Sequence, residues 1–188
     1  MTVTAGLVLA AGAGRRFGGP KAPAVVDGER LVDRAVRVLR DGGCDPVVVV
    51  LGAWVGHVPD ADVLDNKEWP TGMGSSLRMG LAHLAEREDV DRVVTTLVDL
   101  PGLTAAAVAR LLACPTELGV ATYDGERRHP VLIGRRHWAG AAAAAVGDQG
   151  ARRYLADNDV TTVEVGDIAC GCDLDHREAD DDSDSVET

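Results

Sequence analysis

Short apolar runs alternate along the chain with segments of helical periodicity, and this alternation narrows the fold more than any other feature. We expect strands at residues 6–10, 46–51, 62–64, 92–98, 119–123, 130–133 and 160–165. We expect helices at residues 31–39, 75–85, 105–112, 136–146 and 150–157. Strands that are apolar throughout are typical of parallel sheets with helices on both faces. The sequence therefore predicts an α/β protein, a three-layer α/β/α sandwich around a mostly parallel (mixed) sheet.

The composition agrees with one globular domain and argues against several classes of function. Of the 188 residues, 46% are hydrophobic, which is enough for a single core. No apolar stretch reaches the roughly 18 residues of a membrane span, and no basic segment opens the chain as in a signal peptide. We therefore expect a cytoplasmic protein without a membrane partner. The formal charge of −11 argues against a nucleic-acid partner, which calls for a basic face.

Acidic residues gather at the C-terminus of the chain. Six of them fall between residues 178 and 188, where there is no lysine. Such a segment has too little apolar surface to fold on its own. We predict a single domain over residues 1–177 and a disordered acidic tail over residues 178–188.

The cysteines form one close pair, Cys170 and Cys172, in a C-x-C arrangement. A zinc site would need a second pair or histidines at ligand spacing, and the set around this pair is incomplete. Ordinary reduced cysteines are therefore favoured over a metal site.

A glycine-rich, basic loop follows the first expected strand. Residues 10–21 contain four glycines and three basic side chains, Arg15, Arg16 and Lys21. Bare backbone N–H groups can wrap an anion, and clustered cations in an otherwise acidic chain suit a triphosphate. Ligands of open α/β sheets bind beyond the carboxyl ends of the strands, where this loop is expected.

Two other interpretations of this loop stay open. One is a dinucleotide-binding fingerprint, G-x-G-x-x-G, which Gly12 and Gly14 fit. Phe17 stands where the third glycine belongs, and residues 18–20 (Gly-Gly-Pro) block the helix that should begin at once. The other is a flexible connector, which leaves the three clustered basic residues unexplained.

Two further segments carry residues suited to phosphate or metal. Asp99 stands at the end of an apolar strand, where a carboxylate suits Mg²⁺, although an aspartate before Pro101 is also common in turns. Residues 72–76 form a glycine-rich turn into a helix whose first turn offers free N–H groups. Ser75 or Ser76 could serve that helix only as its N-cap.

Several of these segments together resemble the MobA-like nucleotidyltransferases. The stretch Leu-Ala-Ala-Gly-x-Gly-x-Arg-Phe-Gly-x-x-Lys at residues 9–21 is similar to the family's first signature, with Gly14 for the usual Ser and Phe17 for the usual Met. Further matches follow in the family's order, at residues 66–77, 99–101, 128–130, 147–152 and 172–176. The resemblance is greatest to the branch that includes molybdenum cofactor cytidylyltransferase.

The resemblance implies a Rossmann-like nucleotidyltransferase fold and a magnesium-dependent reaction. A nucleoside monophosphate would pass from a nucleoside triphosphate, with CTP favoured, to a small phosphorylated acceptor such as molybdopterin, and pyrophosphate would be released. It further implies a molybdoenzyme or chaperone as protein partner. CTP rests on the Ala10-Ala11-Gly12 form of the loop.

The resemblance also implies roles for individual residues. The nucleotide would be bound by Leu9, Ala10, Ala11, Gly12, Gly14, Arg16, Lys21, Gly72, Ser75 and Ser76. Catalysis would rest on Lys21, Arg16 and Asp99. Magnesium would be held by Asp99 with Asp173 or Asp175, and the acceptor by His129 and Arg152. Arg128 and His176 stand where the family has Gly and Thr.

Two other classes of function stay open from the sequence. One is an NAD(P)H-dependent oxidoreductase on a similar fold, because similar sequences carry that label in nicotine breakdown. Phe17 and the Asp99-Leu100-Pro101 segment count against it. The other is a non-catalytic nucleotide-binding module, against which the full set of metal and phosphate ligands counts.

Overall fold

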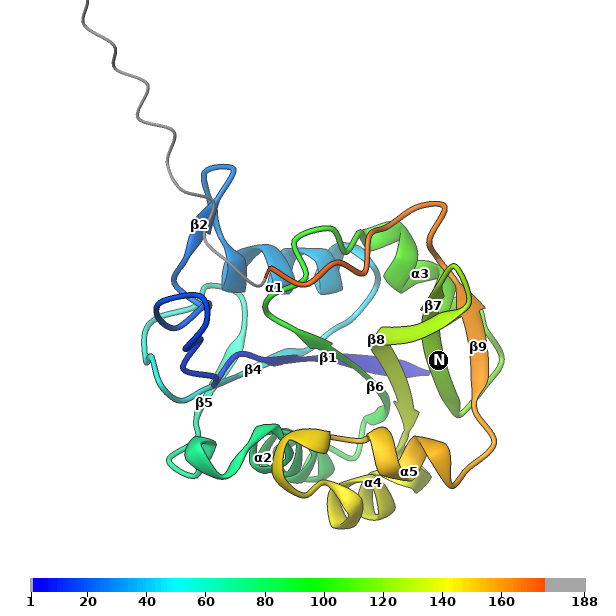
Figure 1. Ribbon diagram of the computed structural model, residues 1–188. Coiled ribbons are helices and arrows are strands. Elements are labelled where there is room, and N and C mark those ends of the chain that lie inside the picture. Colours follow the sequence, from blue (N-terminus) through cyan, green and yellow to red (C-terminus); the bar gives the residue numbers. More distant parts are fainter. Residues whose placement is uncertain (1, 175–188) are drawn as a thin grey trace, which may run out of the picture.

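A seven-stranded sheet forms the centre of the protein, in a computed structural model that describes residues 2–174 (Figure 1). Its order is β5-β4-β1-β6-β8-β7-β9. β8 runs antiparallel to both of its neighbours, β6 and β7, and the other pairs in this sheet are parallel. The strands are β1 (Val3–Leu9), β4 (Val47–Leu51), β5 (Asp62–Asp65), β6 (Val90–Leu97), β7 (Leu118–Tyr123), β8 (Glu126–Gly134) and β9 (Thr161–Glu164).

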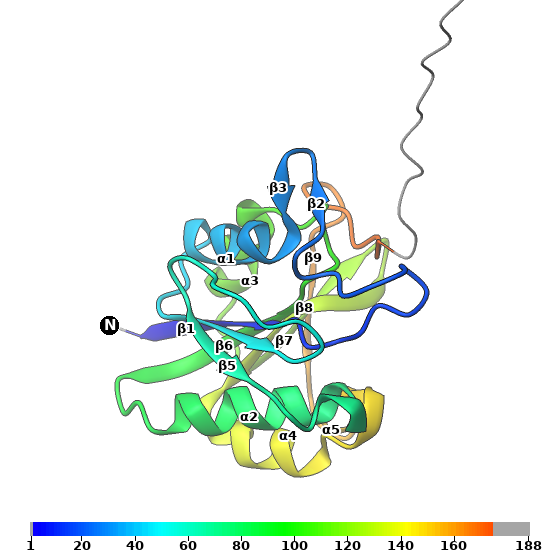
Figure 2. The same cartoon turned by 90° about the vertical axis from the view of Figure 1, so that its left-hand side faces the viewer.

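Helices cover both faces of this sheet (Figures 1 and 2). One face carries α1 (Leu31–Asp41) and α3 (Ala105–Ala113), and the other carries α2 (Met73–Ala85), α4 (Trp138–Ala144) and α5 (Arg152–Ala156). The prediction of a three-layer sandwich with a mostly parallel, mixed sheet is confirmed. Thr104 caps α3 as a helix start of this type should, accepting a hydrogen bond from the Ala107 N–H at 3.2 Å.

β4 shows why these strands are apolar at every position. All five of its residues are buried. Val47, Val49 and Leu51 belong to the core cluster under α1 and α3, whereas Val48 and Val50 belong to the cluster over α2 and α4. Each such side chain contributes about 1.5–3 kcal/mol when fully buried. A sheet covered on one face only would have needed polar residues at alternate positions.

Some short elements were not predicted. β2 (Val25–Val26) and β3 (Glu29–Arg30) form a separate hairpin, whose turn residues Asp27 and Gly28 both have positive φ. Short 3₁₀ turns also occur at η1 (Trp69–Thr71), η2 (Arg135–His137) and η3 (Gly147–Gln149). β8 begins four residues before the expected strand, because it pairs with β7 beyond Pro130.

Several sequence expectations lie outside the described residues. These are the acidic tail at residues 178–188, Asp175 and His176. Within residues 2–174, no helix is long and apolar enough to span a bilayer.

Candidate active site

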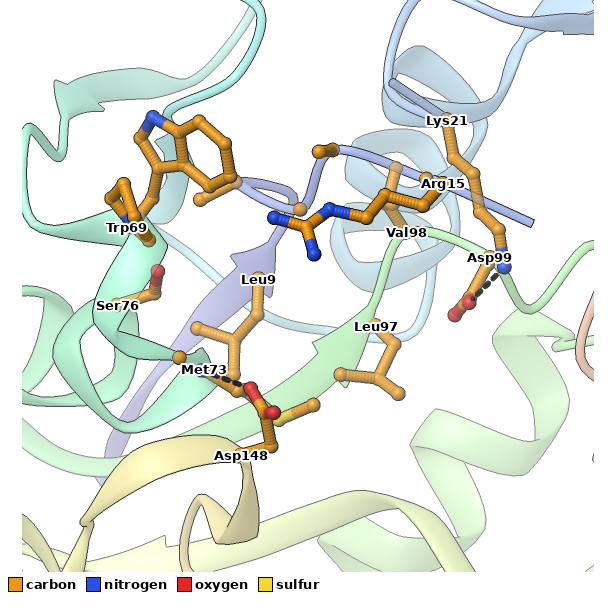
Figure 3. Close-up of a pocket in the computed structure, with 16 residues that line it drawn as sticks. Leu9, Arg15, Lys21, Trp69, Met73, Ser76, Leu97, Val98, Asp99 and Asp148 are labelled. Carbon is orange, nitrogen blue, oxygen red and sulfur yellow. Dashed lines mark hydrogen bonds and ion pairs between the residues drawn. The ribbon is translucent and has the colours of Figure 1, made fainter. Parts of the chain in front are cut away.

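A cleft of about 390 Å³ opens at the carboxyl ends of β1 and β6 (Figure 3). We call it the loop cleft, because residues 11–15 and Lys21 of the glycine-rich loop form much of its wall. Its other lining residues come from the start of α2, from the segment after β6 and from η1 and η3. The position agrees with the rule that open α/β sheets bind ligands beyond the strand ends.

The glycine-rich loop is held in one tight turn. Gly14 has a φ of +57°, and its carbonyl accepts a hydrogen bond from the Gly19 N–H at 3.1 Å. A Cβ at residue 14 would lie 1.9 Å from the Gly19 carbonyl oxygen, so a side chain cannot fit there. Phe17 is buried in the core and anchors the outer part of the loop. The backbone around Gly14 is therefore a fixed wall of the loop cleft.

Arg15, rather than Arg16, lines the loop cleft. Its side chain follows the Gly14 turn and extends across the cleft between Trp69 and Asp99 (Figure 3). Arg16 is exposed and is not among the lining residues. Ala10 is likewise absent from the lining, because it is buried in the core beneath the loop. Leu9, Ala11, Gly12, Gly14 and Lys21 line the cleft, where the sequence had placed the nucleotide.

Asp99 lies at the floor of the loop cleft as one half of an ion pair. Lys21 Nζ donates to Asp99 Oδ2 at 2.7 Å, and the two side chains are 15% and 20% exposed. The other carboxylate oxygen, Oδ1, is buried and has no hydrogen-bond partner within the described residues. A buried, unsatisfied carboxylate oxygen is costly unless a ligand completes it. Asp99 Oδ1 therefore suits a metal ion.

The donor set around Asp99 fits magnesium with substrate phosphates rather than an all-protein metal cage. Within residues 2–174, no group of three or more His, Cys, Asp or Glu side chains could hold a metal. Magnesium is often bound by one or two carboxylates together with water and phosphate oxygens. The backbone next to Asp173 lies beside Asp99, because the following residue, Leu174, donates its N–H to the Asp99 carbonyl at 2.9 Å.

The two predicted serines have different positions. Asn66 Nδ2 donates to Ser75 Oγ at 2.9 Å and to Ser76 Oγ at 3.0 Å. Ser76 lines the loop cleft, whereas Ser75 is buried beside Asn66 and does not. Neither serine is the N-cap, because α2 begins at Met73 with Gly72 before it. Gly72 itself lines the cleft.

Trp69 and Asp148 are among the residues of the loop cleft that the predicted site lacked. Trp69 lies on the wall opposite Arg15 (Figure 3). Asp148 Oδ1 accepts a hydrogen bond from the Met73 N–H at 3.3 Å and so caps α2 from a distant segment. Both stand inside segments that match the family's motifs, which is the signal that could have identified them.

A second cavity of about 530 Å³ adjoins the first. We call it the hairpin cavity, because Glu126–His129 of the β7–β8 hairpin line it together with Arg152 and Asp173. Residues of the sheet, α2, η3 and α5, many of them apolar, complete its lining. The two cavities share Leu9, Met73, Leu97 and Asp148. The structure thus brings His129, Arg152 and Asp173 together, beside the loop cleft.

His129 is a neutral group at neutral pH. Burial lowers the pKa of His129 to about 4, the charge of Asp99 opposes this shift, and the charge of Arg152 adds to it. The His129 carbonyl accepts a hydrogen bond from the Tyr123 hydroxyl at 3.0 Å. A neutral imidazole near the charges of Asp99 and Arg152 can donate or accept a hydrogen bond without adding charge to the site.

Cys170 and Cys172 form a disulfide, so the expectation of reduced cysteines is wrong for this pair. Their Cα atoms lie 5.4 Å apart, with Gly171 between them. Cys44 and Cys114 are free thiols. Burial raises the pKa of the Cys44 thiol to about 12, as for an inert core cysteine.

Comparison with known proteins agrees with this geometry. The MobA-like NTP transferase domain matches residues 6–163. The chain is 35% identical to the nicotine blue oxidoreductase of Paenarthrobacter nicotinovorans, over 90% of this chain and 91% of that protein. It is 32% identical to the molybdenum cofactor guanylyltransferase of Rhizobium johnstonii, over 68% of this chain and 61% of that protein.

Solved structures show the same fold. The Rv0371c homologue from Mycobacterium sp. strain JC1 matches with a TM-score of 0.77 and 27% identity, covering 92% of this chain and 90% of that one. Rv0371c of Mycobacterium tuberculosis H37Rv, solved as a complex with manganese, matches with a TM-score of 0.69 and 24% identity, covering 87% and 88%. The family match over residues 6–163 shows that the chain belongs to the MobA-like NTP transferase family, and the sheet and the loop cleft are consistent with this.

Proposed function

We propose that this protein is a magnesium-dependent nucleotidyltransferase that moves a nucleoside monophosphate from a nucleoside triphosphate to a phosphorylated acceptor. The observation that carries the proposal is the buried, unpaired Oδ1 of Asp99, next to Lys21 and the glycine-rich loop. A carboxylate oxygen without a partner, a lysine and bare N–H groups are the parts a metal-bound triphosphate needs. The adjoining hairpin cavity offers room for the acceptor.

The proposed reaction depends on alignment of the two substrates and on neutralisation of phosphate charge more than on acid–base groups. An acceptor phosphate oxygen is already ionised near neutral pH, so it attacks the α-phosphorus without a general base. The new bond joins that oxygen to the α-phosphorus, the bond from the α-phosphorus to the pyrophosphate oxygen breaks, and pyrophosphate leaves. Bound magnesium would supply Lewis-acid stabilisation of the charge that develops on these oxygens.

The residues of the loop cleft bind the triphosphate and neutralise its charge in this proposal. Lys21 leaves Asp99 for the triphosphate, and Arg15 or Arg16 adds positive charge from the loop. Asp99, together with Asp173 or Asp175, would hold the metal. The N–H groups around Gly14 are already fixed, so little conformational freedom is lost when they meet the phosphates.

CTP is the donor we favour, because of the Ala10-Ala11-Gly12 form of the loop. The similarity to a guanylyltransferase makes GTP the alternative. For the acceptor, the hairpin cavity combines apolar side chains with Arg127, Arg128 and Arg152. This combination suits a molecule with a flat organic body and a phosphate, such as molybdopterin. A molybdoenzyme or chaperone partner and a cytoplasmic location remain predictions.

Magnesium is the metal we propose, and manganese is a fair substitute for it in experiments. Both are divalent ions that accept oxygen ligands. A structure of related fold holds manganese, which supports a divalent metal in this site as well.

A second candidate function is NAD(P)H-dependent reduction, which the similarity to nicotine blue oxidoreductase favours. The loop argues against it. Gly14 and Gly19 close a tight turn there, and no helix begins within residues 10–21, whereas a dinucleotide fingerprint needs one at that point.

One experiment separates these functions. Thermal unfolding is measured with CTP, GTP, ATP, UTP or NADPH, each with and without Mg²⁺, because a ligand of the native state raises its apparent stability. We expect CTP to stabilise the protein most, and only with Mg²⁺. Greatest stabilisation by GTP with Mg²⁺ would make GTP the donor in place of CTP. Stabilisation by NADPH alone would overturn the transferase proposal.

A further inference from the structure

The disulfide lies on the surface and directly precedes Asp173, which lines the hairpin cavity. Cys170 and Cys172 are exposed, whereas Gly171 between them is buried. A reductant can therefore reach both sulfur atoms, although the turn that they close is packed into the protein. A Cβ at Gly171 would lie 2.7 Å from the Tyr123 ring and 3.0 Å from Arg128 Cδ, so the turn fits closely against the hairpin.

This turn is joined to the segment that carries Asp99 at both of its ends. Before the turn, the Cys170 N–H donates to the Gly102 carbonyl at 3.0 Å. After it, the Leu174 N–H donates to the Asp99 carbonyl at 2.9 Å. Asp173 stands between the disulfide and the second of these bonds, and it lines the hairpin cavity. The disulfide thus closes the short stretch of chain that presents Asp173.

The same turn is joined to the wall of the hairpin cavity. Arg128 Nη1 donates to the Gly171 carbonyl at 3.3 Å. Tyr123, against which Gly171 packs, donates its hydroxyl proton to the His129 carbonyl. The position of the turn is therefore coupled to two residues that line the hairpin cavity, Arg128 and His129.

We propose that Cys170–Cys172 is a redox site whose oxidised form fixes Asp173 for metal binding and whose reduced form weakens that binding. Opening the disulfide returns conformational freedom to residues 170–174, and metal binding must then remove that freedom again. This inference rests on the proposed function, because Asp173 matters only if the site holds a metal.

The reductant is a dithiol, either a small molecule or a protein with two thiols. One of its thiolates attacks one cysteine sulfur, so that a mixed disulfide forms and the other cysteine leaves as a thiolate that takes up a proton. The second thiol of the reductant then attacks the mixed disulfide. Two electrons pass to the protein, which ends with two S–H groups, and the reductant leaves as a disulfide.

The test measures Mn²⁺ binding to oxidised and to reduced protein at one fixed concentration of CTP, because phosphate oxygens complete the proposed metal site. Free Mn²⁺ is determined by electron paramagnetic resonance. The protein is reduced with dithiothreitol, freed of it by anaerobic desalting, and its thiols are counted in both states. We expect two thiols in the oxidised form and four in the reduced form. We expect the oxidised form to bind Mn²⁺ at least about threefold more tightly than the reduced form.

Three variants complete the test. The double variant Cys170→Ser/Cys172→Ser should bind Mn²⁺ like the reduced protein, with or without dithiothreitol. Cys114→Ser removes a free thiol elsewhere and should keep the full redox response. Asp173→Asn should bind weakly in both states. A redox response that survives in Asp173→Asn would overturn the role given to Asp173.

Failure of the redox proposal and failure of the proposed metal site give different results. Equal and measurable Mn²⁺ affinity in the two states would overturn the redox proposal and leave the metal site in place. Four thiols before reduction would overturn it as well. Mn²⁺ binding no greater than that of CTP alone, in both states, would overturn the metal assignment itself, and the redox proposal with it.

Discussion

The loop cleft and the hairpin cavity are neighbours, yet they are built from different parts of the chain. The loop cleft has one wall of backbone, fixed by the Gly14 turn and by glycines that leave N–H groups bare. The hairpin cavity presents side chains, among them Arg128, His129 and Arg152. Backbone recognises what all triphosphates share, whereas side chains can be exchanged without rebuilding the fold. The backbone wall therefore suits the triphosphate of the proposed reaction, whereas the side chains of the hairpin cavity suit a more specific acceptor.

Asp99→Asn should break the site most severely, because it removes the charge that both the metal and Lys21 need while keeping the shape. We expect turnover to fall by about 10³-fold, on the scale of losing one electrostatic contact in an active site. Pyrophosphate release measures the rate, and thermal unfolding checks that the fold survives. Turnover within about tenfold of the wild type would remove Asp99 from the metal site.

Gly14→Ala tests whether the wall of the loop cleft depends on backbone alone. The new Cβ would meet the Gly19 carbonyl, so the turn must open and triphosphate affinity should fall by about tenfold or more. Gly28→Ala is the matched control, since Gly28 also has a positive φ, of +80°, but has open space around it in the distant hairpin. Equal affinity in the two variants would show that the Gly14 turn does not shape the site.

Arg152→Gln and Arg15→Gln separate the two cavities. Arg152→Gln should raise the KM for the acceptor by about tenfold and leave the KM for the triphosphate unchanged, and Arg15→Gln should do the reverse. Steady-state kinetics with each substrate varied in turn measures both. Equal effects of either variant on both substrates would contradict the division into donor and acceptor cavities.

The smallest effect concerns His129 and pH. Its folded-state pKa of about 4 lies below its ordinary value of 6.5, so between these values the unfolded chain binds more protons. The His129 contribution to stability is therefore full above about pH 6.5 and is lost as the pH falls toward 4, by at most about 1.4 kcal/mol per pH unit. Urea unfolding at pH 5 and 7 measures it, and His129→Asn should reduce the difference. An unchanged difference would place the pH dependence elsewhere.

Local patterns predicted the fold well, because they act over a few residues. The valine run of β4, the Thr104 cap and the glycine-rich loop are visible in the sequence and occur where expected. The Asp27-Gly28 hairpin was missed, although an Asp-Gly pair is a known turn signal. It is flanked by strands of two residues each, too short for alternation to be seen.

The site was less predictable where contacts join distant parts of the chain. Arg15 and Arg16 are adjacent, and only Arg15, directly after the Gly14 turn, lines the cleft. Asn66, directly after β5, donates hydrogen bonds to both Ser75 and Ser76, yet only Ser76 lines the cleft. The disulfide depends on how residues 170–174 pack, which no spacing in the sequence reveals.

The ion pair between Lys21 and Asp99 has a thermodynamic consequence for the order of binding. A triphosphate that arrives alone must take Lys21 from Asp99 and leave a carboxylate unpaired, and a metal that arrives alone must leave the lysine unpaired. Each ligand bears the cost of breaking the pair when it comes first, and the other then binds without that cost. If the proposed site binds both ligands, the pair thus makes metal and nucleotide positive heterotropic effectors of each other, by equal factors in both directions.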